Sequence, residues 1–142
     1  EHQFPSNMII RLPGLVGPGL KKNIIYDIHN ENDLLKVDSR GVFQFYPMVN
    51  LWYDIELLMQ LGLNIAHLTA EPISVSEVSK DGFGITFENY ALDRPQTYDF
   101  QTLYATQFGG TGRYTYTKRE TLQAVRDYAQ KEPKASQNIQ KG

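Results

Sequence analysis

The sequence predicts a small mixed α/β domain. Apolar segments rich in β-branched residues alternate with segments of helical periodicity, and this alternation is typical of α/β architecture. Two capping boxes, Ser-Val-Ser-Glu at 74–77 and Thr-Lys-Arg-Glu at 117–120, mark the starts of two helices. With 142 residues and 41% hydrophobic content, the chain is long enough to bury a core of its own. We therefore expect a single domain over 1–132 and a polar tail over 133–142.

The first half of the chain should hold two strands and two helices. Ile9 and Ile10 are β-branched and suit a strand, whereas the glycines and prolines that follow should make the chain turn. The spacing of Leu51, Ile55 and Leu58 predicts a helix with one apolar face. The expected elements are a strand over 8–12, a loop over 13–20, a helix over 24–28, a strand over 42–46 and a helix over 48–61.

The second half should hold short elements and one long helix. Gly82 and Gly84 should stop the helix that the first capping box opens. Apolar residues spaced by three and four follow the second capping box, so the clearest helix in the sequence begins there. The expected elements are a strand over 65–68, a helix over 75–81, a strand over 85–88, an irregular segment over 89–98, a helix over 100–108 and a helix from 118 onward.

Composition excludes several classes of function. The chain has no cysteine, which excludes disulfides, thiolate metal sites and a cysteine nucleophile. A formal net charge of −2 without long charged blocks argues against nucleic-acid binding. No apolar run approaches the ~20 residues of a membrane helix, so we expect no membrane partner and a cytoplasmic protein. The spacing of the three histidines does not match that of metal ligands. The sequence starts at Glu1, just before a predicted strand, and this suggests a piece of a larger protein.

The loop over 13–20 and the residues after it form a candidate anion site. Lys22 and Asn23 stand just before a predicted helix, whose first N–H groups would point toward an anion. A simple connector with solvated lysines is the alternative. Arg40 and Arg94 could each bind a phosphate or carboxylate, or could lie solvated at the surface.

The order of these segments resembles the extended short-chain dehydrogenases, the NAD-dependent epimerase/dehydratase family. The segment over 10–19 is similar to that family's Arg-x-x-x-x-x-Gly-Pro strand and loop. Phe-Gln-Phe-Tyr at 43–46, Glu-Pro-Ile-Ser-Val-Ser-Glu at 71–77, Arg-Pro at 94–95 and Phe-Gly at 108–109 follow in the family's order. The resemblance implies the C-terminal portion of a Rossmann-type fold, a small mixed α/β substrate domain.

The resemblance also implies what this chain would bind. The family's glycine-rich turn and its catalytic Tyr-x-x-x-Lys belong to the N-terminal half, which the resemblance does not cover. Tyr114 and Lys118 of this sequence have the same spacing, but we interpret their segment as a strand that leads into the second capping box. The chain alone would then be non-catalytic and would hold no cofactor, while the parent protein would use NAD or NADP. The backbone of Pro13, Gly14 and Leu15 would border the nicotinamide. A small-molecule substrate, with a nucleotide sugar as the implied class, would be surrounded by Lys22, Asn23, Arg40 and Arg94.

Two kinds of association follow from this interpretation. The strand over 8–12 should expose an unpaired apolar edge, so we expect self-association or docking to the N-terminal cofactor domain. A non-catalytic binding or assembly module that keeps the scaffold is the alternative function. It is favoured by Gly14, which stands where sugar-nucleotide epimerases often place a substrate-contacting Asn, and by Arg40, which lies one residue out of the family's register.

Overall fold

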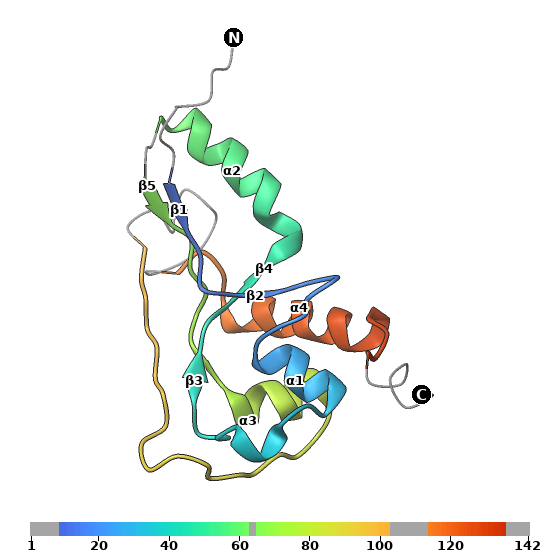
Figure 1. The fold of residues 1–142 in the computed structure, drawn as a ribbon. Coiled ribbons are helices and arrows are strands. Elements are labelled where there is room, and N and C mark those ends of the chain that lie inside the picture. The colour runs from blue at the N-terminus through green and yellow to red at the C-terminus, as the bar shows by residue number, and fades with distance from the viewer. Residues whose placement is uncertain (1–8, 63–64, 103–113, 136–142) are drawn as a thin grey trace.

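The computed structural model describes residues 9–62, 65–102 and 114–135 and has a mixed α/β fold (Figure 1). Two parallel strand pairs and one antiparallel pair lie among the helices. The strands are β1 (Ile9–Arg11), β2 (Gly14–Val16), β3 (Val42–Phe43), β4 (Phe45–Pro47), β5 (Ile65–His67) and β6 (Ile73–Ser74). The helices are α1 (Ile24–Asn30), α2 (Leu51–Gln60), α3 (Val75–Glu77) and α4 (Lys118–Lys131), with 3₁₀ turns at Leu34–Lys36 and Met48–Asn50 and a π-helical turn at Val78–Gly82.

One end of the molecule is built from β1, β5 and α2 (Figure 1). β1 and β5 run parallel, with Ile10 opposite Ala66. Leu58 of α2 is fully buried and belongs to the same apolar cluster as Ala66 and Leu68, with Ile10 packed against it. Since parallel strands need a long crossover connection, α2 serves as part of the crossover between β1 and β5.

The other end is a helical layer of α1, α3 and α4 (Figure 1). Ile25 and Val125 are fully buried in a second apolar cluster, which also holds Val75 and Val78. Both predicted capping boxes are present, because Ser74 and Thr117 accept hydrogen bonds from the third helical N–H and the glutamates reach back. β2 and β4 pair in parallel between the two clusters and join them.

Most expected elements are confirmed, with bounds that differ by a few residues. The strand over 42–46 is interrupted at Gln44, so it forms β3 and β4 with different partners. The helix over 48–61 begins as a 3₁₀ turn before α2, and Gly62 follows it with a φ of 70°. Most of the helix expected over 100–108 lies outside the described residues, and 100–102 are irregular.

Two expectations are wrong. The segment over 13–20 is not all loop, because Gly14–Val16 forms β2 against β4. A Cβ on Gly14 would lie 3.1 Å from the Gln44 carbonyl oxygen, so glycine permits this close strand approach. The segment over 85–88 alternates as expected, with Phe87 packed on the core, but it pairs with no described strand. Its N–H at Ile85 instead closes the π-helical turn by donating to the Ser79 carbonyl.

Candidate functional site

The candidate site begins where β1 and β5 end. A cavity of about 230 Å³ opens at the carboxyl ends of these strands. Arg11 and His67, the last residues of the two strands, both line it. Its remaining lining residues are Leu12, Pro13, Leu68, Thr69 and Phe100. The carboxyl ends of parallel strands are the usual place for ligands in open α/β sheets.

A larger cavity of about 500 Å³ adjoins the first and shares three of its residues, Leu12, Pro13 and Phe100. Its other lining residues are Gly14, Asn23, Ile24, Phe43, Gln44, Phe45, Gln96 and Tyr98. This volume lies in the range of small-molecule sites, roughly 300 to 1,000 Å³. The two cavities together form what we call the strand-end site.

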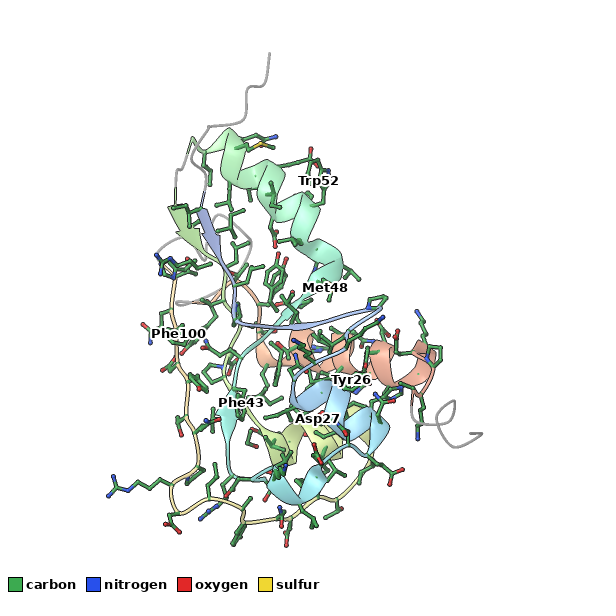
Figure 2. The ribbon with its side chains drawn as sticks, in the orientation of Figure 1. Tyr26, Asp27, Phe43, Met48, Trp52 and Phe100 are labelled. Atoms are coloured by element: carbon green, nitrogen blue, oxygen red, sulfur yellow. The ribbon has the colours of Figure 1, made fainter. Side chains whose placement is uncertain are left out.

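Backbone hydrogen bonds hold the segment over 96–100 beside β3. Val42 donates its N–H to the Gln96 carbonyl at 2.8 Å, and Tyr98 donates to the Val42 carbonyl at 3.0 Å. The buried Gln44 side chain forms two hydrogen bonds to the Phe100 backbone: its Nε2 donates to the Phe100 carbonyl and its Oε1 accepts from the Phe100 N–H. Figure 2 shows Phe43 and Phe100 as they project from these two neighbouring segments. The side of the cavity that carries the aromatic rings is therefore fixed by main-chain contacts.

Of the expected cofactor-facing residues, Pro13 and Gly14 line the strand-end site and Leu15 does not. Gly14 is exposed and has no side chain, so a flat group could approach its backbone closely. Leu15 lies in β2 and packs against the cluster around Tyr46. The alternation of β2 explains this difference, because successive residues of a strand face opposite sides.

Asn23 lines the site, but its side chain already caps α1. Its Oδ1 accepts from the N–H groups of Ile25 at 2.9 Å and Tyr26 at 3.3 Å, and its Nδ2 donates to the Leu15 carbonyl. Two of the N–H groups expected to face an anion, those of Ile25 and Tyr26, are therefore satisfied within the chain. Its backbone has a φ of 92°, which few residues other than glycine adopt. Lys22 is exposed beside it and does not line the strand-end site.

Arg40 and Arg94 lie outside the strand-end site. Arg94 is exposed. Arg40 forms a two-pronged ion pair with the buried Asp38, at 3.0 and 2.9 Å, and also donates to the Leu92 carbonyl. Its guanidinium lies 4.4 Å from the centre of the Tyr90 ring. The Arg40 guanidinium holds the pKa of the Asp38 carboxyl well below its usual range.

We expect Arg40→Lys to loosen the loop around Leu92. Leu92 donates its N–H to the Asp38 carboxylate, and a lysine cannot hold that carboxylate in the same two-pronged geometry. Hydrogen exchange at the Leu92 amide should become about tenfold faster in Arg40→Lys. Arg94→Lys is the matched control and should leave this amide unchanged. Equal rates in the Arg40 variant and the unmodified chain would contradict this role.

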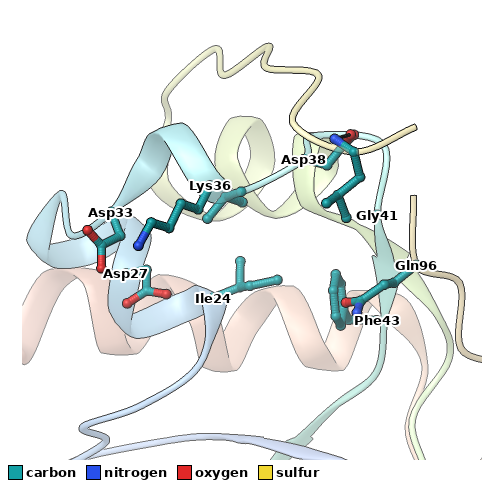
Figure 3. Close-up of a pocket in the computed structure, with 10 residues that line it drawn as sticks. Ile24, Asp27, Asp33, Lys36, Asp38, Gly41, Phe43 and Gln96 are labelled. Carbon is teal, nitrogen blue, oxygen red and sulfur yellow. Dashed lines mark hydrogen bonds between the residues drawn. The ribbon is translucent and has the colours of Figure 1, made fainter. Parts of the chain in front are cut away.

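A further cavity of about 320 Å³ shares Ile24, Phe43 and Gln96 with the strand-end site. Figure 3 shows Lys36 pointing toward Asp27 and Asp33 on one side of it, while Phe43 and Gln96 lie on the other. Its charged lining side chains are Asp27, Asp33, Asp38 and Lys36. Carboxylates outnumber cations there, so this cavity disfavours anionic ligands.

A buried polar cluster stands beside the site, and sequence reasoning missed it. Asp54 of α2 is 2% exposed and accepts hydrogen bonds from the hydroxyls of Tyr46 and of Tyr116, the latter at 2.6 Å. Burial raises the pKa of the Asp54 carboxyl, and the two hydroxyl donors partly offset this shift. Burial also raises the pKa of both tyrosines. The polar position of Asp54 within the apolar stripe of α2 was the signal that could have revealed it.

The described residues form neither a metal site nor a membrane-spanning helix, and the chain matches no known family. Among the residues that the structure describes, no three His, Cys, Asp or Glu side chains gather closely enough to hold a metal ion. No helix in this part of the chain is long and apolar enough to cross a membrane. No family model matches the chain, and no curated protein matches it either.

Proposed function

We propose that this chain is the substrate-binding portion of an NAD(P)-dependent oxidoreductase similar to the epimerase/dehydratase family, and that it is inactive alone. The observation that carries the proposal is the position of the strand-end site. It opens at the carboxyl ends of the parallel strands β1 and β5, whose connection includes the α2 crossover. Nucleotide-binding α/β proteins place their ligands at this position of the sheet.

Exposed residues on one face of the β1–β5 pair support a cofactor domain beyond this chain. Ile10 and Ala66 face α2, whereas Ile9, Arg11 and His67 are exposed, with Ile9 at 51%. Parallel sheets are normally covered on both faces, because each crossover places a helix on one of them. Among the described residues, β1 pairs only with β5. The proposed N-terminal half would supply further strands and cover this face.

The backbone at Pro13 and Gly14 fits a flat ring at the boundary of the two halves. Gly14 lines the cavity without a side chain, so a nicotinamide could lie against the backbone there. When bound, the nicotinamide supplies hydride transfer to or from the substrate carbon. This chain would bind and orient the substrate with the apolar walls of the larger cavity and would keep water away from it.

The proton-transfer groups would come from the other half. The charged residue types Asp, Glu, Lys and Arg are absent from the lining of the larger cavity within the described chain. The family's catalytic Tyr and Lys would transfer the proton from the cofactor domain, while this chain would bind the substrate. The resemblance implies a nucleotide sugar as the substrate of the joined protein, whereas the uncharged lining of the larger cavity favours a substrate without phosphate.

The test is to join this chain to the segment encoded before Glu1 and to titrate the product with NADH and NADPH in a calorimeter. We expect saturable binding of one nucleotide by the joined protein and none by this chain alone. A Tyr-x-x-x-Lys within about thirty residues of Glu1 should be present in that segment. A joined protein that binds neither nucleotide would overturn the proposal.

A non-catalytic assembly module is the second candidate, and the outer face of α2 favours it. Trp52 and Tyr53 of α2 are 61% and 72% exposed. Val49, in the 3₁₀ turn just before α2, is 71% exposed and lies three and four residues before them, at the spacing of one helical face. Figure 2 shows Trp52 on the side of α2 that faces away from β1. Exposed apolar clusters of this kind often mark interaction surfaces.

We expect the isolated chain to self-associate through exposed apolar surface, and sedimentation can locate that surface. Association through the edge of β1 should survive Trp52→Ala, because that edge lies apart from the outer face of α2. Association that Trp52→Ala abolishes, in a joined protein that binds no nucleotide, would favour the assembly module. A chain that stays monomeric at high concentration would contradict self-association by either surface.

A further inference from the structure

We propose that the substrate of this site is a molecule without phosphate that carries a planar, uncharged ring system, and that this ring binds against four aromatic side chains of the larger cavity. These side chains are Phe43, Phe45, Tyr98 and Phe100, and we call them the aromatic wall. The identification of the bound ring as the substrate rests on the proposed function. The binding of such a ring follows from the cavity itself.

The rings of the aromatic wall form a continuous series. Phe45 and Phe43 are stacked with centroids 6.2 Å apart, Phe43 and Tyr98 are tilted at 5.5 Å, and Tyr98 and Phe100 are stacked at 6.0 Å. Tyr98 and Phe100 are 39% and 57% exposed, so their rings retain accessible surface. Aromatic pairs at 4.5 to 7 Å gain energy beyond simple burial, and a further planar ring could extend the series.

The charge of the lining disfavours a phosphate-bearing ligand. The larger cavity is lined, in the described chain, by apolar, amide and glycine residues and by one tyrosine. The cavity that adjoins it through Phe43 and Gln96 is lined by three aspartates and one lysine. A diphosphate in the larger cavity would lack a cationic partner in the lining, and in the adjoining cavity it would meet three carboxylates and a single lysine. Arg11, a cationic residue, lies instead at the end of β1 in the smaller cavity, on the side that the proposed cofactor domain would cover.

The polar groups of the cavity are mostly used within the chain. The Asn23 carboxamide caps α1, and the Gln44 carboxamide binds Ala70 and Phe100. Gln96 presents its carboxamide beside Phe43 (Figure 3). The amide of Gln96 can donate a hydrogen bond, so a carbonyl on the planar ring would suit this end of the cavity.

The probe for this proposal is coumarin, a neutral, planar, bicyclic molecule with one ring carbonyl. We expect coumarin to bind the chain saturably, with amide shifts in a ¹H–¹⁵N spectrum at Phe43, Tyr98 and Phe100. Tyr98→Ala should weaken this binding about tenfold, because the exposed ring of Tyr98 is lost while its backbone hydrogen bond to Val42 remains. Leu35→Ala is the control, since this side chain is 88% exposed, lies in the 3₁₀ turn at Leu34–Lys36 and is outside the cavity, so the affinity should be unchanged.

Three further ligands are compared with coumarin to test which property of the ligand the aromatic wall recognises. 2-Adamantanone, which is neutral but not planar, should bind about tenfold more weakly than coumarin. UDP-glucose should not displace coumarin, and displacement that depends on Tyr98 would overturn the proposal in favour of a nucleotide sugar. Reduced nicotinamide mononucleotide that displaces coumarin in the same way would assign the aromatic wall to the cofactor and also overturn it.

Failure of this proposal can be told apart from failure of the proposed function. A chain that keeps its spectrum but binds coumarin no better than 2-adamantanone would overturn the planar-ring proposal alone. The joined protein could still bind NADH or NADPH in the calorimetric test. If coumarin binds as expected while the joined protein binds no nucleotide, the ring is a ligand of this site without being the substrate of a dehydrogenase.

Discussion

Asp54→Ala is expected to lower the free energy of unfolding by about 3 kcal/mol, because it leaves two buried tyrosine hydroxyls without their acceptor. Tyr46 is fully buried and Tyr116 is 8% exposed, and both donate to the same oxygen of Asp54. These bonds connect α2, β4 and the segment before α4. The substitution would therefore loosen the packing of three segments that are distant in sequence.

Urea unfolding, followed by circular dichroism, measures this effect. Asp54→Asn keeps an acceptor oxygen, so it should cost only about 1 kcal/mol. Glu56→Ala removes an exposed carboxylate from the same helix and should change the stability little. If Asp54→Ala were as stable as Glu56→Ala, the hydrogen bonds to Asp54 would have no net stabilising role.

The stability contributed by Asp54 should depend on pH in a specific direction. Its folded carboxyl has a pKa above the usual 3.8, so the folded chain binds more protons than the unfolded chain between these two values. The contribution is therefore fully present below the usual pKa and is lost as pH rises through the raised pKa. The stability difference between the unmodified chain and Asp54→Asn should be larger at about pH 4 than at about pH 8. A difference that grows with pH would contradict a raised pKa.

Gly82→Ala is expected to destabilise the chain by about 2 kcal/mol through overpacking. A Cβ at this position would lie 2.5 Å from Cγ1 of Val125, which is fully buried in α4. Valine in a helix has one strongly preferred side-chain rotamer, so Val125 cannot easily turn away. Alanine also reduces the entropy of the unfolded chain, which stabilises the fold by only about 0.4 to 1 kcal/mol. The clash should therefore outweigh the entropic gain.

A double-mutant cycle with Val125→Ala tests the cause. Val125→Ala alone should cost about 2 kcal/mol through the cavity it leaves. In the double variant the new methyl group can occupy part of that cavity, so its loss of stability should be smaller than the sum of the two single losses. Strict additivity would show that Gly82 is required for another reason than its contact with Val125.

The sequence by itself determined the elements whose signals are local. Both capping boxes, the helices α1, α2 and α4 and the strands β1 and β5 follow from residue type and spacing within a few residues. These signals suffice because a capping hydrogen bond joins residues only three apart and an apolar stripe repeats every turn. The mixed α/β class follows from the order of the same elements.

Only the tertiary structure decided the composition of the site and of the buried polar cluster. Residue type could not show that Asn23 caps α1 or that Arg40 binds Asp38, because the same side chains can bind a ligand. The aromatic wall joins residues about 55 positions apart through the bonds of Gln44 to Phe100. The cluster at Asp54 likewise depends on a contact 62 positions away. Such contacts depend on how the chain packs, and short-range periodicity carries no information about them.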